Sequence, residues 1–128
     1  MTTDLTYLVW AVALTLVQLL VTIAGATGQF ALPVLAGNRE TPLEGRGWVG
    51  RAQRAHRNML ENLVPFAIVV LVAHITGKAN AMTALGAALF FYSRAVYAVV
   101  YWFGIPWLRS GVFTVAMAGV VLILAQLL

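Results

Sequence analysis

Four long apolar stretches dominate the sequence, and each is close to the length that a helix needs to cross a membrane. They cover about residues 5–35, 48–76, 81–103 and 109–127. A spanning helix requires about 20 mostly apolar residues. The 128-residue chain is 62% hydrophobic and only 9% charged, so it carries more apolar side chains than a water-soluble protein of this size can bury. We therefore expect the bilayer to be its solvent.

The connections between these stretches are short. A polar loop over 37–47 follows the first stretch, and residues 77–80 and 104–107 separate the others. Short connections place consecutive helices side by side in opposite directions. The sequence therefore predicts an all-α, integral membrane antiparallel four-helix bundle, forming a single domain over residues 1–128.

Basic residues are distributed unequally over the two predicted sides of the membrane. The connections after the first and third helices, with their flanks, contain Arg39, Arg46, Arg51, Arg54, Arg57 and Arg109. The opposite side has Lys78 and the acidic Asp4. Because cytoplasmic loops carry the excess of Lys and Arg, both termini are predicted to face away from the cytoplasm. This topology explains the net charge of +4 better than nucleic-acid binding does, so no nucleic-acid partner is expected.

Cysteine is absent and histidine is scarce. Without cysteine the chain can form no disulfide, thiolate nucleophile or cysteine-ligated metal site. His56 and His74 are too few and too far apart to indicate a metal site, so none is expected.

Polar residues concentrate where the second and third stretches approach the predicted cytoplasmic side. Spacings of three and four residues place Arg54, Asn58 and Glu61 on one helical face. The third stretch offers a similar row, formed by Arg94, Tyr97 and Tyr101, and the fourth opens with Arg109 and Ser110. Arginines bind carboxylates bidentately, so this convergence predicts a site for an anionic or amphoteric ligand.

Each of these residues also has a structural interpretation. Arg51 and Arg54 can anchor the helix to lipid phosphates. Arg57 with Glu61 can form an ion pair, and Arg94, which lies between uncharged segments, can either pair with Glu61 or contact a ligand. Both alternatives stay open on the sequence alone.

One segment of this polar region has a recognisable pattern. The run RAHRNMLEN over residues 54–62, followed by Pro65 and Phe66, resembles the second-helix signature of the MAPEG family, the membrane-associated proteins in eicosanoid and glutathione metabolism. The similarity extends to Thr27-Gly28-Gln29 and to the polar residues of the third and fourth stretches. The short chain and compact loops are similar to a bacterial branch of the family, which implies a bacterial inner membrane.

The resemblance implies a homotrimer that holds glutathione, as co-substrate, in clefts between neighbouring subunits near the cytoplasmic side. The residues expected to contact or support glutathione are Arg57, Asn58, Glu61, Arg94, Tyr97, Tyr101 and Ser110. Arg109 is expected to stabilise the thiolate. A hydrophobic small-molecule electrophile, delivered from the lipid, would be conjugated or reduced, as by a glutathione S-transferase or peroxidase.

Three positions depart from the family pattern. Ala31 stands in place of an arginine, Met59 in place of an aspartate, and Phe113 in place of a tyrosine. Each change removes a polar contact and leaves the scaffold intact. The alternative function is therefore a non-catalytic membrane binding or scaffold protein that retains the trimeric fold.

Overall fold

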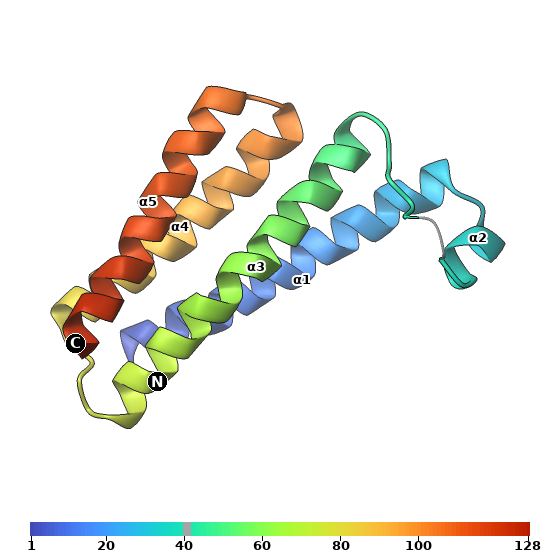
Figure 1. Ribbon diagram of the computed structural model, residues 1–128. Coiled ribbons are helices and arrows are strands. Elements are labelled where there is room, and N and C mark those ends of the chain that lie inside the picture. The colour runs from blue at the N-terminus through green and yellow to red at the C-terminus, as the bar shows by residue number, and fades with distance from the viewer. Residues whose placement is uncertain (40–41) are drawn as a thin grey trace.

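The computed structural model describes residues 1–39 and 42–128 and consists of four long helices and one short helix (Figure 1). The helices are α1 (Thr3–Gln29), α2 (Leu32–Ala36), α3 (Trp48–Ile75), α4 (Ala81–Phe103) and α5 (Pro106–Leu127). Both termini lie at the same end of the bundle (Figure 1). Glu40 and Thr41, which belong to the predicted first loop, lie outside the described residues.

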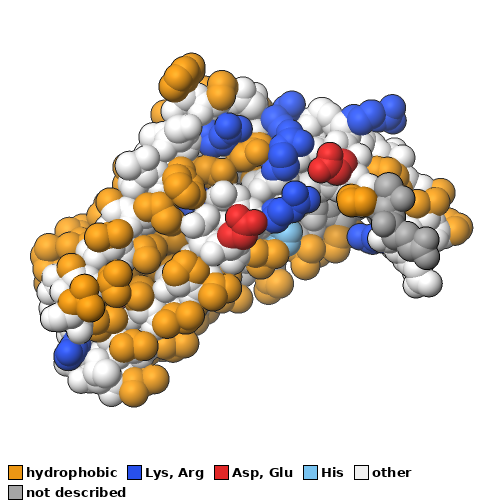
Figure 2. All heavy atoms as spheres, viewed as in Figure 1, with side chains coloured by type: hydrophobic (Ala, Val, Ile, Leu, Met, Phe, Trp, Pro, Cys, Tyr) orange, Lys and Arg blue, Asp and Glu red, His pale blue; other side chains and the backbone are white. Residues whose placement is uncertain are grey.

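The four long helices are each long and apolar enough to cross a membrane. Apolar side chains cover much of the face seen in Figure 2, whereas most of the basic side chains in view gather towards the end where α3 begins. Large apolar residues such as Leu20, Val64 and Val121 are 64%, 61% and 60% exposed, as lipid contact requires. The predicted fold class, an all-α membrane four-helix bundle, is confirmed, and the protein is an integral multi-pass membrane protein.

Two helix boundaries differ from the predicted ones, and both differences involve proline. α1 ends at Gln29 instead of near residue 35, because the next two residues are extended and Pro33 lies in the first turn of the separate helix α2. Proline fits the first turn of a helix, where its missing N–H would have no helical partner, but it disrupts a helix interior. For the same reason α5 begins at Pro106, before the predicted start at residue 109.

Helix α4 is fixed between α5 and α3 by close packing. A Cβ atom added to Gly86 would lie 2.5 Å from the carbonyl oxygen of Gly119 on α5, and the reciprocal distance is also 2.5 Å. Glycine at both positions lets the two backbones approach this closely. On α3, the Phe66 ring stacks on Phe90 with their centroids 3.9 Å apart. These two contacts set the rotation of α4 and hence the direction of its polar row.

The turn after α4 brings the start of α5 to the end of the bundle where α3 begins. α4 ends at Gly104, whose left-handed conformation (φ 75°) closes the helix. Nearby, Arg51 Nε donates to the carbonyl oxygen of Trp102 at 3.0 Å. Arg51 therefore ties the first turn of α3 to the last turn of α4, a contact inside the protein that the sequence did not predict.

Candidate functional site

Arg94 is almost completely buried, with 1% of the residue exposed. Its Nη1 donates to Asn58 Oδ1 at 2.8 Å, and its Nε donates to Met59 Sδ at 3.4 Å. The guanidinium carbon lies 4.1 Å from the centroid of the Tyr97 ring, one turn further along α4. Glu61, which the sequence offered as a structural partner, is exposed. An amide, a thioether and an aromatic face therefore surround this charge.

Met59 changes what Arg94 can bind. A thioether sulfur is a weak hydrogen-bond acceptor and carries no charge. Arg94 Nη2 is buried without a hydrogen-bond partner among residues 1–39 and 42–128. An aspartate at position 59, as in the family pattern, would supply both an acceptor and a negative charge at this point. Met59 cannot neutralise the positive charge of Arg94 as an aspartate would. That charge lies beside Asn58 and Tyr97.

Tyr101 connects two arginines from different helices. Its hydroxyl accepts a hydrogen bond from Arg54 Nε on α3 at 3.2 Å, and its ring centroid lies 4.6 Å from the guanidinium carbon of Arg109 on α5. The Tyr97 and Tyr101 rings are 5.5 Å apart. The cation–π contact restricts where the Arg109 charge can lie.

A cleft of about 280 Å³ opens between α3, α4 and α5 at this level. It is lined by Asn58, Tyr97, Arg109, Ser110, Phe113 and Thr114. The lining offers one positive charge, an amide that can donate and accept, three hydroxyl groups and one apolar ring. Four predicted site residues thus line one cleft. Arg94 contacts two of them, Asn58 and Tyr97, and Tyr101 contacts Tyr97 and Arg109. The combination suits a polar ligand that carries a carboxylate or thiolate.

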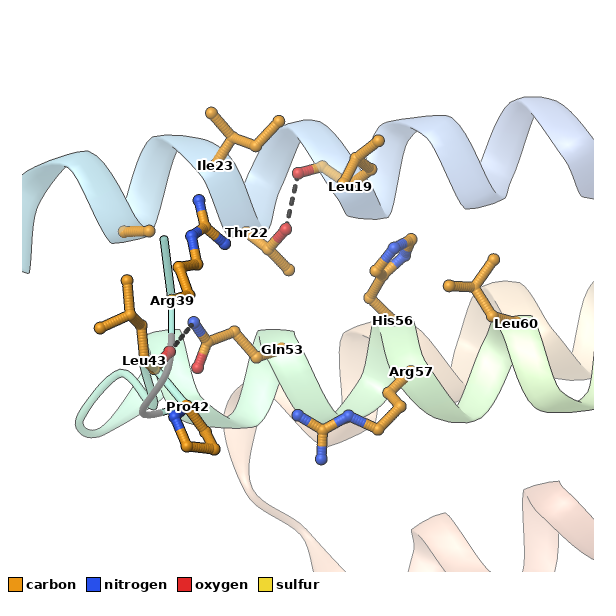
Figure 3. A pocket seen from close by; sticks show the side chains of 11 residues that line it. Leu19, Thr22, Ile23, Arg39, Pro42, Leu43, Gln53, His56, Arg57 and Leu60 are labelled. Carbon is orange, nitrogen blue, oxygen red and sulfur yellow. Dashed lines mark hydrogen bonds between the residues drawn. The ribbon is translucent and has the colours of Figure 1, made fainter. Parts of the chain in front are cut away.

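Arg57 lines a different cavity, a groove of about 440 Å³ between α1 and α3 (Figure 3). Its lining includes Arg39, His56 and apolar residues of α1 such as Leu19 and Ile23. Figure 3 shows His56 directed towards α1, whereas Arg57 extends along α3 away from α1. Neighbouring helix residues differ in direction by about 100°, which is why Arg57 and Asn58 open onto different faces of α3.

Two glutamines attach the first loop to the helices on either side of it. Gln53 Oε1 accepts from the backbone N–H of Gly45 at 2.7 Å, and its Nε2 donates to the Leu43 carbonyl at 3.1 Å. Gln29 Oε1 accepts from the Arg46 N–H at 2.7 Å, and its Nε2 donates to the Arg46 carbonyl at 3.0 Å. Each amide therefore satisfies two backbone groups that the loop would otherwise leave unpaired.

Several residues of the two cavities were not identified from the sequence. Thr114 lies four residues after Ser110, and Gln53 lies four residues before Arg57, so helical spacing could have placed both on the relevant faces. Arg39 carried no local signal, because its position depends on the path of the loop. Within residues 1–39 and 42–128, no group of three or more His, Cys, Asp or Glu side chains could hold a metal ion.

Comparison with known proteins identifies the family. A model described as the MAPEG family matches residues 7–128, nearly the whole chain. No curated protein and no solved structure gives a significant match. The matched residues include α3, α4 and α5, most of α1, and every residue that lines the α3–α4–α5 cleft. The chain therefore belongs to the MAPEG family.

Proposed function

We propose that this protein binds glutathione in the α3–α4–α5 cleft and uses the glutathione thiolate to conjugate or reduce hydrophobic electrophiles. The MAPEG family is known for glutathione use, and the observation that carries the proposal is the cleft itself. It brings Asn58, Tyr97, Arg109 and Ser110 together at one level of the bundle. Glutathione has two carboxylates, an ammonium group and a thiol, and these groups match the donors and acceptors of that lining.

The residues divide into two roles. Asn58, Arg94, Tyr97, Tyr101 and Ser110 would bind or support the polar parts of glutathione. Exposed Glu61 would receive the ammonium group, and Arg57 would bind a carboxylate.

Arg109 has the chemical role. Its positive charge lies in the cleft and is held by the Tyr101 ring. A cation beside a thiol favours the ionised form, which is the nucleophile. In conjugation by substitution, the thiol proton leaves to solvent, the glutathione sulfur forms the new bond to carbon, and the leaving group, such as chloride, departs with the electrons of its bond. In reduction of a hydroperoxide, two glutathione molecules would supply the two electrons and become the disulfide, and the peroxide oxygens would leave as an alcohol and water. The electrophile would enter sideways from the lipid that surrounds the helices.

The site would be completed by assembly into a homotrimer. Arg57 lines the α1–α3 groove, whereas Asn58 and Arg109 line the α3–α4–α5 cleft, at the same end of the bundle. A ring in which one face of each subunit meets a different face of the next would bring a groove against a cleft. This arrangement would let Arg57 of one subunit reach ligand held by its neighbour. We further propose that both termini face away from the cytoplasm of a bacterial inner membrane.

A non-catalytic binding or scaffold protein is the second candidate. Phe113 lines the cleft where the family pattern has a tyrosine, and its ring lies 6.4 Å from that of Tyr97. Met59 replaces a carboxylate beside Arg94. Both changes make the site less polar, which favours binding without efficient turnover.

Calorimetry and a conjugation assay together separate the two candidates. Glutathione binding to the purified protein in detergent is measured first, and turnover of 1-chloro-2,4-dinitrobenzene is measured next. Arg109→Ala should lower turnover on the order of a hundredfold, because it removes the charge that stabilises the thiolate. Arg46→Ala is the matched control, since Arg46 is exposed at the same end but lies outside the cleft.

The outcomes are distinct. No heat of binding at millimolar glutathione would exclude a glutathione site. Binding by both proteins without turnover would support the scaffold function. Equal turnover by wild type and Arg109→Ala would exclude Arg109 from the mechanism, but it would not contradict the proposed glutathione-binding site.

A further inference from the structure

The end of the bundle opposite the cleft contains a buried carboxylate. Asp4, in the first turn of α1, is only 4% exposed. Its Oδ2 atom is buried and has no hydrogen-bond partner among residues 1–39 and 42–128. An ionised carboxylate that is buried without a partner is strongly unfavourable. Its position therefore calls for a hydrogen-bond donor from outside the chain.

Asp4 lines an open pocket of about 400 Å³ between the start of α1 and the start of α4. The α1 side is formed by Thr2, Thr3 and Asp4, and the α4 side by Asn80 with neighbouring alanines. Asp4 is the ionisable residue of this lining, so the pocket has negative charge and hydroxyl groups on one wall and a small apolar surface on the other.

The polar groups on the α4 side already have partners. Asn80 Oδ1 accepts from the backbone N–H groups of Met82 and Thr83 at 2.8 and 2.9 Å. Its Nδ2 donates to Gln126 Oε1 at 3.0 Å. Lys78, the single lysine, donates from Nζ to a backbone carbonyl at the end of α5 at 3.3 Å. These groups serve the ends of α4 and α5, and none of them donates to Asp4 Oδ2.

The pocket lies at the level of lipid headgroups. α1 has 27 residues, and at 1.5 Å per residue it is about 40 Å long, which exceeds the roughly 30 Å of a hydrocarbon core. Tyr7 and Trp10 follow Asp4 on α1 and contact each other edge to face, with ring centroids 5.4 Å apart. Tyrosine and tryptophan favour the membrane interface, so the first turn of α1 lies among the headgroups.

We propose that this pocket binds the primary ammonium headgroup of an aminophospholipid such as phosphatidylethanolamine. A primary ammonium supplies a positive charge and three N–H donors. One N–H would bond Asp4 Oδ2, and the others would face the wall formed by Thr2 and Thr3, which line the same pocket. The choline headgroup carries the same charge but has no N–H, so it cannot satisfy the buried oxygen. The acyl chains would lie against the exposed apolar sides of α1 and α4.

Lipid retention by the full-length protein tests this assignment. The protein is placed in nanodiscs of phosphatidylcholine that contain a minor fraction of phosphatidylethanolamine, and native mass spectrometry then counts the lipids that stay bound. Wild type should enrich phosphatidylethanolamine about tenfold over its share of the bilayer, as expected for a charge-assisted hydrogen bond. Asp4→Asn should show no enrichment. Glu44→Gln is the matched control, because Glu44 is an exposed carboxylate at the other end.

A second series does not depend on any variant. Mono- and dimethylated phosphatidylethanolamine should be retained progressively less by the wild type, because each methyl group removes one N–H donor. Equal retention of phosphatidylethanolamine and phosphatidylcholine would overturn the proposal, as would unchanged enrichment by Asp4→Asn. Displacement of the lipid by millimolar free ethanolamine would identify a soluble amine as the occupant and would also overturn it.

Discussion

Arg94 of α4 donates a 2.8 Å hydrogen bond to the side-chain oxygen of Asn58 on α3, within two membrane-spanning helices. The same oxygen accepts a second bond from Asn62 Nδ2 at 3.1 Å. A neutral amide therefore orients a buried guanidinium and also forms part of the cleft wall. Asn58 therefore lies between the positive charge of Arg94 and the proposed ligand.

Asn58→Ala should destabilise the protein. The change removes the acceptor of Arg94 Nη1, and a buried donor that loses its partner costs about 1–3 kcal/mol, or more when it is charged. We expect the free energy of unfolding in detergent to fall by at least this amount. Thermal or denaturant unfolding of the purified protein measures it.

Asn62→Ala is the control on the same helix. Asn62 Nδ2 donates to the Asn58 backbone and side-chain oxygens, and its loss leaves the Arg94 contact in place. The Asn62→Ala change should lower the free energy of unfolding by no more than about 1 kcal/mol. Equal destabilisation by the two variants would show that Arg94 does not depend on Asn58.

Tyr101 should act on ligand binding through its ring more than through its hydroxyl. Tyr101→Phe removes the acceptor for Arg54 but keeps the face that holds Arg109. Tyr101→Leu removes both. Since a cation–π contact contributes about 0.5–2 kcal/mol, glutathione affinity should weaken about 2- to 30-fold in the leucine variant and stay close to wild type in the phenylalanine variant.

Calorimetric titration with glutathione compares the three proteins. If the phenylalanine variant binds glutathione as weakly as the leucine variant, the effect belongs to the hydroxyl and its contact with Arg54. Wild-type affinity in both variants would show that Tyr101 does not contribute to glutathione binding.

Much of the fold follows from the sequence because each spanning helix satisfies its own backbone in lipid. Apolar length alone located the four helices, and short connections gave their antiparallel order. The helix ends at Gln29 and Pro106 were misplaced because a count of apolar residues does not register where proline can begin a new helix.

The site could be predicted only in part. Spacing within one helix correctly placed Arg94, Tyr97 and Tyr101 in one row, because that relationship is local. The division of Arg57 and Asn58 between two cavities depends on the rotation of α3 against its neighbours. That rotation is set by contacts between helices, such as Phe66 on Phe90, which no local pattern specifies.

Gln29→Ala should loosen the first loop. The side chain makes both of its hydrogen bonds to the Arg46 backbone, so the change removes two bonds at once. At about 0.5–1.5 kcal/mol each, their loss should raise the population of the open loop several-fold or more. Faster trypsin cleavage after Arg46 in the folded protein would reveal it.

Gln126→Ala is the matched glutamine variant at the other end of the bundle, where Gln126 accepts from Asn80. It should leave cleavage after Arg46 unchanged. Equal rates in Gln29→Ala and wild type would mean that other contacts hold the loop closed.

Gly86→Ala should force α4 away from α5. The added methyl carbon would lie 2.5 Å from the Gly119 carbonyl oxygen and 2.7 Å from Ile123 Cγ1, so the helices must separate or shift. Overpacking of this kind typically costs about 1–3 kcal/mol, and it would also disturb the contact between Tyr101 and Arg109 that spans the same pair of helices.

Gly111→Ala on α5 is the control, because nothing lies within 4 Å of its added carbon and alanine favours a helix. Unfolding measurements should therefore show a lower stability for Gly86→Ala and an equal or higher stability for Gly111→Ala. Wild-type stability in both variants would mean that α4 and α5 are not packed through these glycines.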